Sequence, residues 1–371
     1  MVNTLIPKFT EHLSSSVTIV GIVASAFAVT SILSRPLVGI VGTILRDRLI
    51  LCISAAILMI AYGLFGFAKS VPAIAIGRLI QGAGMAFVGP ICLTIASNSL
   101  PRDRIASGIA VFSIGQAAAN AFGPSIGLWI LSKIGYSAAF FTSSTIMLMA
   151  LIISLTIPRG SDKKRISCKV SIESFIEKKA LTPAIIFFFL GGAYSCIVSY
   201  IVLYGESRGI QNCGVFFSAY AVFVIISRSF SGRIGDKYGV FYVIVLGMIC
   251  FFISFHVISV SSDIGMFIFA GAFSALGYGI CQPSVQALCM MRVPEQRRNT
   301  AGNTCYLGVD VGYLAMPTVA GGIINYAQSG GKDLVESYIF MYRAISLAIV
   351  CALVIYIFSE KKSIQHERLR R

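Results

Sequence analysis

The sequence predicts an all-α, polytopic membrane protein. The chain has 371 residues, of which 56% are hydrophobic and 12% are charged, and its mean hydropathy is +0.84. A soluble domain cannot cover so much apolar surface with so few charges. The charges gather in short clusters between neutral runs, and each run reaches the roughly 20 residues that a membrane-spanning helix needs. Because these runs are continuous rather than alternating, helices are favoured over a β-barrel.

We expect eleven full membrane spans. Nine of them are uncharged stretches, which lie at 12–34, 49–68, 79–101, 105–132, 134–158, 180–205, 209–227, 238–262 and 264–291. Two further spans, 299–324 and 337–359, contain single charges or have polar ends, and the first of them contains Asp310.

The distribution of basic residues predicts the orientation in the membrane. The formal net charge is +15, and if successive loops alternate between the two sides, 23 of the 30 lysines and arginines fall on one side. Cytoplasmic loops carry this excess, so the linker 159–180 and the C-terminus are expected in the cytoplasm. Orientation thus explains the positive charge without nucleic acid, and a multi-pass protein of the plasma or inner membrane, in contact with lipid, is expected.

The cysteine pattern does not indicate a metal site. The ten cysteines lie mostly within apolar runs, without a C-x-x-C pair and without a histidine at ligand spacing. Small buried apolar side chains are the favoured interpretation. We expect neither a metal nor a cofactor.

An internal repeat relates the two halves of the chain at an offset of 193 positions. Punctuating residues match at this offset, namely Arg35 with Arg228, Gly39 with Gly232, Gly84 with Gly277, Pro90 with Pro283, Pro101 with Pro294, Arg104 with Arg297, Gly115 with Gly308 and Pro124 with Pro317. The two copies have the same orientation, so an even number of helices separates them, and six fits. Repeats of this kind mark secondary transporters, whose substrate site lies near the midplane between the repeats.

The offset also predicts the domain boundaries. We expect an N-terminal helical bundle at 1–158, a cytoplasmic linker at 159–180, a C-terminal bundle at 181–359 and a basic cytoplasmic tail at 360–371. Subtracting the offset from the seventh span, 181–203, gives a helix that begins before Met1 and ends at residue 10. We therefore expect residues 1–10 to be the remnant of a first helix that is largely missing here and that starts upstream.

The strongest motif in the chain runs from Gly232 to Gly239, with the sequence GRIGDKYG. Gly232 allows two helices to approach closely, and Asp236 can cap or pair at a helix end beside the inside charge of Lys237. Arg228, about one turn before Gly232, is expected to reach the carboxylate of Asp236. The pattern resembles the loop motif of the major facilitator superfamily, which implies two pseudo-symmetric six-helix bundles and a gate that these residues close.

The first half carries this gate motif incompletely. Arg35 and Gly39 match Arg228 and Gly232, whereas Thr43 stands at the position of Asp236. Asp47 could substitute for the missing carboxylate, but it lies one helical turn away from the expected position.

A second motif surrounds Arg78, in the sequence GRLIQGAG from Gly77 to Gly84. It resembles the fourth-helix motif of the family, whose arginine is associated with proton transfer. Arg78 lies at the start of the uncharged run 79–101, and burying it within the span is costly unless it faces a cavity or a partner. The alternative is that it lies near the outer end of its helix and extends to the interface.

A third motif, from Gly115 to Gly127, resembles the fifth-helix motif of exporters. Gly115, Gly123, Pro124 and Gly127 supply its small and bent positions, and Leu128 departs from the final glycine of the family pattern. Simple close packing would explain the glycines equally well. Gln116 and Asn120 lie one turn apart and either contact substrate or bridge helices. Together with Gln81 and Gln282, they are our candidates for the lining of a cavity.

Asp310 is the one acidic residue well inside a span. A carboxyl group in such apolar surroundings suits reversible protonation, so Asp310 and Arg78 are the candidates for proton coupling. The alternative for Asp310 is a structural hydrogen bond between helices.

These features predict a secondary active transporter, and the leading hypothesis is proton-coupled export of small apolar or amphipathic molecules by alternating access. Spans with few fixed charges do not hold a strongly ionic substrate well. The alternative is a proton-coupled importer of a small nutrient, a sugar or an organic acid, and a receptor without transport is a third interpretation. An enzyme is not expected, because no clustered His/Asp/Glu or Ser/His/Asp set is present. The expected partners of a monomer are a small-molecule substrate and a proton or other coupling ion.

Overall fold

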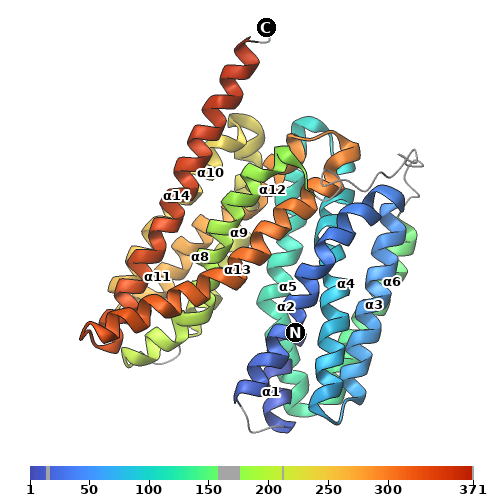
Figure 1. The fold of residues 1–371 in the computed structure, drawn as a ribbon, viewed down its shortest axis with the longest axis vertical. Helices are drawn as coiled ribbons and strands as arrows, with labels where there is room; N and C mark the ends of the chain where they lie inside the picture. The colour runs from blue at the N-terminus through green and yellow to red at the C-terminus, as the bar shows by residue number, and fades with distance from the viewer. Residues whose placement is uncertain (14–16, 158–175, 211–212, 370–371) are drawn as a thin grey trace. The chain divides into compact units, whose positions relative to one another are not determined.

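The computed structural model describes residues 1–13, 17–157, 176–210 and 213–369, and these residues form helices joined by short turns (Figure 1). They divide into two compact units. Unit 1 comprises Met1–Asn98, Ala118–Lys178 and Pro294–Asn303, and unit 2 comprises Ser99–Ala117, Lys179–Val293 and Thr304–Arg371. Residues 159–175 of the expected linker 159–180 lie outside the described residues, as do residue 158 and the end of the tail, 370–371.

Unit 1 is a bundle of long helices. It contains α1 (Val2–Leu13), α2 (Val17–Ile44), α3 (Asp47–Phe67), α4 (Val71–Asn98), α6 (Tyr136–Thr156) and the later part of α5 (Ile105–Lys133). Helix α3 packs against α4 and α6, α2 packs against α4, and α1 contacts α2, α4 and α6. The core between them is apolar, with Leu5, Leu58 and Phe65 almost fully buried. The stretch 1–10, predicted to be helical, lies in α1.

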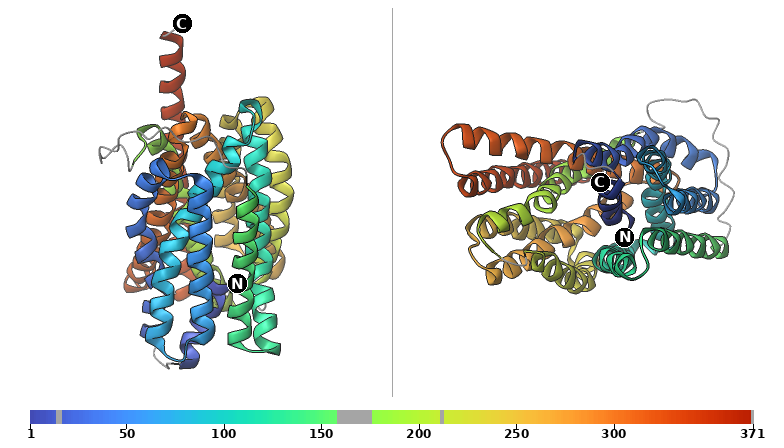
Figure 2. Two further views of the ribbon diagram at one scale, coloured as in Figure 1. Left: turned by 90° about the vertical axis from the view of Figure 1, so that its right-hand side faces the viewer. Right: turned by 90° about the horizontal axis from the view of Figure 1, so that it is seen from below.

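Unit 2 is a second helical bundle. Its helices are α8 (Leu181–Ser207), α9 (Val215–Tyr238), α10 (Val240–Val260), α11 (Ile264–Ser274), α12 (Ile280–Met291), α14 (Leu334–Leu369) and most of α13 (Arg298–Ser329). Helix α9 packs against α11, while α14 packs against α8 and α10. A π-helical turn, η3 (Ala275–Gly279), joins α11 to α12. Figure 2 shows the end of α14, in red, projecting beyond the other helices of this unit.

The offset of 193 positions recurs in the helix boundaries. It carries Asp47–Phe67 of α3 onto Val240–Val260 of α10, and Val71–Asn98 of α4 onto the run of α11, η3 and α12. The short 3-10 turns η1 (Arg102–Arg104) and η4 (Glu295–Arg297) correspond in the same way. One difference stands out, because the π-helical turn η3 corresponds to a regular stretch of α4.

Nine helical stretches among the described residues are long and apolar enough to cross a membrane. They include α3, α4, α6 and the continuous run from Ile264 to Met291. Helices α2 and α5, which we also expected to span, have 28 and 29 residues. An all-helical membrane fold is confirmed, and the number of eleven full spans stays a prediction.

Candidate functional site

Arg78 lies in the interior of unit 1. Its exposed fraction is 5%, so its side chain is held among helices rather than extending to the surface. The guanidinium donates from Nη1 to Asn3 Oδ1 and to Gln81 Oε1, each at 2.9 Å, and from Nε to the carbonyl oxygen of Val23 at 3.4 Å. It also lies over the ring of Phe27, with Cζ 4.9 Å from the centroid. A buried cation thus has hydrogen-bond acceptors supplied by α1, α2 and α4.

The Arg78 cluster joins two predicted residues to one that the sequence did not reveal. Gln81 is 2% exposed and its Nε2 lies 3.4 Å from Asn3 Oδ1, so the two amides and the guanidinium form one polar group that extends from the buried Arg78 and Gln81 to the exposed Asn3. Asn3 was missed because residues 1–10 were treated only as a helix end. The sequence of α1, VNTLIPKFTEHL, contains several other polar residues, so nothing in it distinguishes Asn3.

Asp236 binds the N-terminus of α5 within unit 2. Its two carboxylate oxygens accept hydrogen bonds from the backbone N–H groups of Ala106 (3.0 Å) and Ser107 (3.1 Å). An anion is stabilised at this position because the first N–H groups of a helix have no partner within the helix and carry the positive end of its dipole. Asp236 thus lies at the N-terminus of α5, and its role in a gate stays a prediction.

The neighbouring glycines of the gate motif allow this contact. A Cβ atom at Gly232 would lie 2.5 Å from Ser107 Cα and 2.7 Å from Ala110 Cβ, so α9 approaches α5 too closely for any other residue. Gly239 has a φ of +93°, which favours glycine, and it ends α9. Lys237 Nζ lies 5.0 Å from the ring centroid of Tyr238.

The expected contact between Arg228 and Asp236 is replaced by another. Arg228 is 3% exposed and donates from Nε to the carbonyl oxygen of Gly279 at 3.1 Å, from Nη2 to Gln282 Oε1 at 2.6 Å, and from Nη1 to the carbonyl oxygen of Ser113. The side chain therefore points into unit 2 rather than along α9 to the carboxylate. Gln282, predicted as a cavity residue, is a partner of this arginine.

The incomplete motif of the first half has its own set of contacts in unit 1. Arg35, 5% exposed, donates from Nη1 to the carbonyl oxygen of Ala86 at 2.8 Å, and its own carbonyl oxygen accepts from Asn303 Nδ2 at 2.8 Å. Asn299 Nδ2 donates to Asp47 Oδ1 at 2.7 Å and to the carbonyl oxygen of Gly42 at 3.0 Å. The Asp47 carboxylate is thus hydrogen-bonded to the side chain of Asn299 in the first turn of α13.

The residues of the predicted packing motif of α5 lie in two different environments. A Cβ atom at Gly127 would lie 2.7 Å from Met1 Cγ, and one at Gly123 would lie 3.1 Å from the Met1 nitrogen, so these glycines admit α1. Gly115 has nothing within 4 Å of its Cβ position, and Gln116 is exposed. Pro124 and Asn120 lie within α5, but their side chains are outside the described part of the chain, and Gly39 lies within α2.

Asp310 lies half-buried on α13, in unit 2, between Gly308 and Gly312. A Cβ atom at Gly308 would collide with the carbonyl oxygen of Ala184, and one at Gly312 with that of Phe188. The backbones of α13 and α8 therefore touch on both sides of this carboxyl group.

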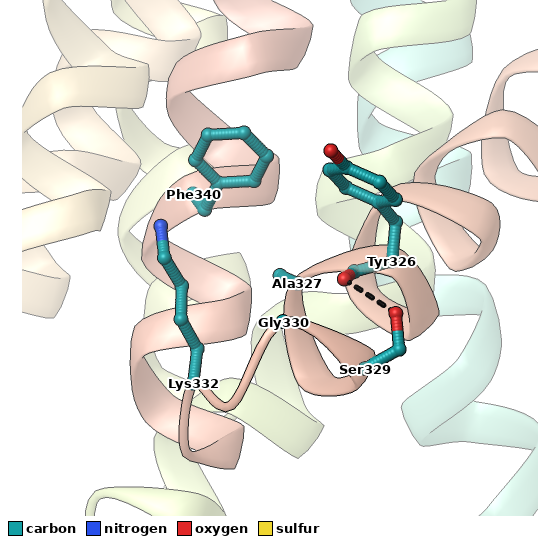
Figure 3. A pocket seen from close by; sticks show the side chains of 6 residues that line it. All are labelled: Tyr326, Ala327, Ser329, Gly330, Lys332 and Phe340. Carbon is teal, nitrogen blue, oxygen red and sulfur yellow. Dashed lines mark hydrogen bonds between the residues drawn. The ribbon is translucent and has the colours of Figure 1, made fainter.

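A small cavity of about 300 Å³ lies at the turn between α13 and α14, apart from all the predicted site residues (Figure 3). Its walls include Tyr326, Ser329 and Phe340, and Lys332 Nζ lies 4.2 Å from the Phe340 ring centroid. The cavity encloses no predicted coupling residue.

Comparisons with known proteins place the chain in a family. The model of the Major Facilitator Superfamily matches residues 1–317 and 211–370. The staphylopine export protein of Staphylococcus aureus strain Mu50 is 24% identical over 81% of this chain and 79% of its own length. The quinolone resistance protein NorA of S. aureus strain MRSA252 is 21% identical over 96% of this chain and 92% of its own.

Solved structures share the fold. The transporter FucP in its outward conformation superimposes with a TM-score of 0.78 at 14% identity, covering 96% of this chain and 93% of its own. The human organic anion transporter MFSD10 gives a TM-score of 0.79 at 13% identity, covering 91% of this chain and 84% of its own. With a family model that matches most of its length, the chain belongs to the Major Facilitator Superfamily and is a membrane transporter rather than an enzyme.

Proposed function

We propose that this transporter exports small apolar or amphipathic molecules by alternating access, in exchange for protons. The observation that carries the coupling proposal is the Arg78 cluster, in which a guanidinium 5% exposed is held by Asn3 and Gln81 inside an apolar bundle. An ionisable group at such a place is costly and is retained for function. The names of relatives that cover most of the chain, an exporter and a resistance protein, favour efflux as the direction.

In this proposal the Asp236 contact is the cytoplasmic gate. The carboxylate binds two backbone N–H groups of α5 from α9. Such a contact can form in one conformation and break in the other without unfolding either helix, because water can replace it on both sides. Asp47 and Asn299 make the corresponding contact of the first half.

Asp310 is the proposed proton carrier. A half-buried carboxyl group, at a place where the backbones of α13 and α8 touch, changes the charge between two packed helices when it gains or loses a proton. That change alters the relative stability of the two conformations of the carrier.

The direction of transport is tested with two membrane preparations that hold the same protein. A panel of radiolabelled amphipathic compounds is offered to intact cells and to inside-out vesicles energised with an inside-acid pH gradient. Export predicts accumulation in the vesicles and exclusion from the cells. The alternative, import of a sugar or organic acid, predicts accumulation in the cells driven by an inward proton gradient.

A further inference from the structure

Four tyrosines from four different elements of unit 2 meet around one ring. Tyr194 of α8 stacks on Tyr278 of η3, with centroids 4.4 Å apart and an angle of 9° between the ring planes. The centroid of Tyr220 of α9 lies 5.3 Å from that of Tyr194, and the centroid of Tyr313 of α13 lies 6.5 Å from it. We call these four residues the tyrosine cluster.

The tyrosine cluster belongs to the second half alone. At the offset of 193 positions its members correspond to Met1, Phe27, Met85 and Asn120. The shared architecture of the two halves therefore does not require tyrosine at these places. The π-helical turn that carries Tyr278 is likewise confined to the second half, and such turns occur often at functional sites.

A buried positive charge lies beside the tyrosine cluster. The Arg228 guanidinium donates to the carbonyl oxygen of Gly279, the residue that follows Tyr278, and its other hydrogen-bond acceptors are the neutral oxygens of Ser113 and Gln282. Within the described residues, Arg228 forms no ion pair. A side chain that is 3% exposed thus keeps its charge without an opposite charge nearby, which is costly.

The rings of the cluster differ in accessibility: Tyr194 and Tyr220 are half-buried, and Tyr313 is the most exposed. Tyr278 is 3% exposed and one face of Tyr194 is covered by it, whereas Tyr313 is 40% exposed. Part of the Tyr313 ring is therefore accessible for stacking on a planar ligand.

We propose that Tyr313, Tyr194 and Tyr220, together with Arg228, form a binding site for a planar aromatic molecule that carries a negative charge, such as a carboxylate. Tyrosines alone would suit an organic cation, since ring faces attract positive charge. The buried guanidinium reverses this preference, because it repels a cation and stabilises an anion. This inference rests on the proposed export function, since it names the class of substrate that the transporter takes.

Binding of four matched probes to the purified full-length protein in lipid nanodiscs tests the site. The probes are 2-naphthoate, its saturated counterpart decalin-2-carboxylate, the neutral 2-naphthylmethanol and the cationic 2-naphthylmethylamine. We expect 2-naphthoate to bind about tenfold or more tightly than each of the others, given the strength of aromatic stacking and of buried charge pairing. Equal binding of the amine and the naphthoate would overturn the proposal.

Variants separate the ring from the charge. Tyr313→Phe keeps the ring and should retain naphthoate binding, whereas Tyr313→Leu should weaken it about tenfold. Arg228→Gln should remove the preference for naphthoate over naphthylmethanol, and Arg35→Gln, which alters the corresponding contact in the other half, should leave that preference intact. If Arg228→Gln does not fold, Tyr220→Phe keeps the ring, loses the hydroxyl group and should reduce the same preference. Unchanged naphthoate affinity in Tyr313→Leu would contradict the site.

Transport measurements on the same preparations distinguish this inference from the proposed function. If amphipathic compounds are exported but naphthoate does not bind, the site is wrong and export stands. If naphthoate binds with the expected profile but no compound crosses the membrane, the site stands and the export proposal fails.

Discussion

Arg35 and Arg228 lie 193 positions apart, and each donates a hydrogen bond to the backbone carbonyl oxygen of the residue 51 positions further along the chain, Ala86 and Gly279. The same contact thus joins α2 to α4 in the first half and α9 to η3 in the second. The similarity ends there, because the second half contains the tyrosine cluster, whereas the corresponding positions of the first half are Met1, Phe27, Met85 and Asn120. A common frame is therefore combined with different chemistry in the two halves.

Replacing Asp236 by alanine should impair both stability and transport. The loss of a carboxylate from a helix N-terminus costs about 1–2 kcal/mol of unfolding free energy. Thermal unfolding and vesicle uptake of Asp236→Ala measure the two effects. The matched control is Asp263→Ala, since Asp263 caps α11 by accepting from the Met266 N–H at 3.0 Å. We expect a similar loss of stability there with transport retained, and equal transport in the two variants would contradict a gating role for Asp236.

Asp47 and Asn299 should show energetic coupling. A hydrogen bond from a neutral amide to a carboxylate contributes about 1.5–3 kcal/mol. The loss of unfolding free energy in the double alanine variant should therefore be smaller than the sum of the losses in the two single variants. A double-mutant cycle on the unfolding free energy measures this coupling, and additive effects would contradict it.

The gate of the second half should be transferable to the first. Thr43 corresponds to Asp236, and Asn299 corresponds to Ala106. We therefore expect Thr43→Asp to restore transport to a variant that already carries Asp47→Ala and Asn299→Ala. Transport that stays absent would show that the shifted position of Asp47 is itself required.

Features that depend on residues close together in the sequence were predictable, whereas contacts between residues far apart in the sequence were not. Features set by local residues were predictable, such as the apolar runs 49–68 and 134–158, which correspond to α3 and α6. The direction of the Arg228 side chain was not, because its acceptors on Gly279 and Ser113 lie 51 and 115 positions away. A single sequence gives no measure of such contacts.

The same limit explains the missed residues. Asn299 donates to Asp47 across 252 positions of the chain, and Asn3 reaches Arg78 across 75. The tyrosine cluster was missed because aromatic residues are common in apolar helices and no spacing rule brings four separate elements together. A comparison of the two halves at the offset of 193 would have marked these four positions as unlike.

Glycines at helix contacts should respond differently from glycines in open positions. Gly308→Ala places a methyl group against the Ala184 carbonyl oxygen, and such overpacking costs about 1–3 kcal/mol. At Gly115 and Gly322, where nothing lies within 4 Å, alanine should stabilise the helix by about 0.5–1 kcal/mol. Thermal unfolding in detergent distinguishes them, and equal shifts at all three positions would contradict the close contact of α13 with α8.

Removal of the Arg78 charge should abolish transport while the protein remains folded. Arg78→Leu leaves Asn3 and Gln81 without their cationic partner in the core, so we also expect a loss of about 1–3 kcal/mol in unfolding free energy. Gln81→Leu is the comparison variant. It removes one hydrogen-bond acceptor of Arg78 but keeps the cation, so it separates the loss of the charge from the loss of a hydrogen bond. Normal transport rates in Arg78→Leu would show that the cluster is only structural.

Proton coupling is tested most directly by measuring both fluxes in one experiment. Purified protein is placed in liposomes that contain a pH-sensitive dye, and a radiolabelled amphipathic substrate is added on one side without an imposed pH gradient. The account predicts that movement of substrate drives protons in the opposite direction, and that Asp310→Asn binds substrate but moves no protons. Substrate movement without any change in internal pH, or an Asp310→Asn variant with the same proton flux as the parent protein, would contradict it.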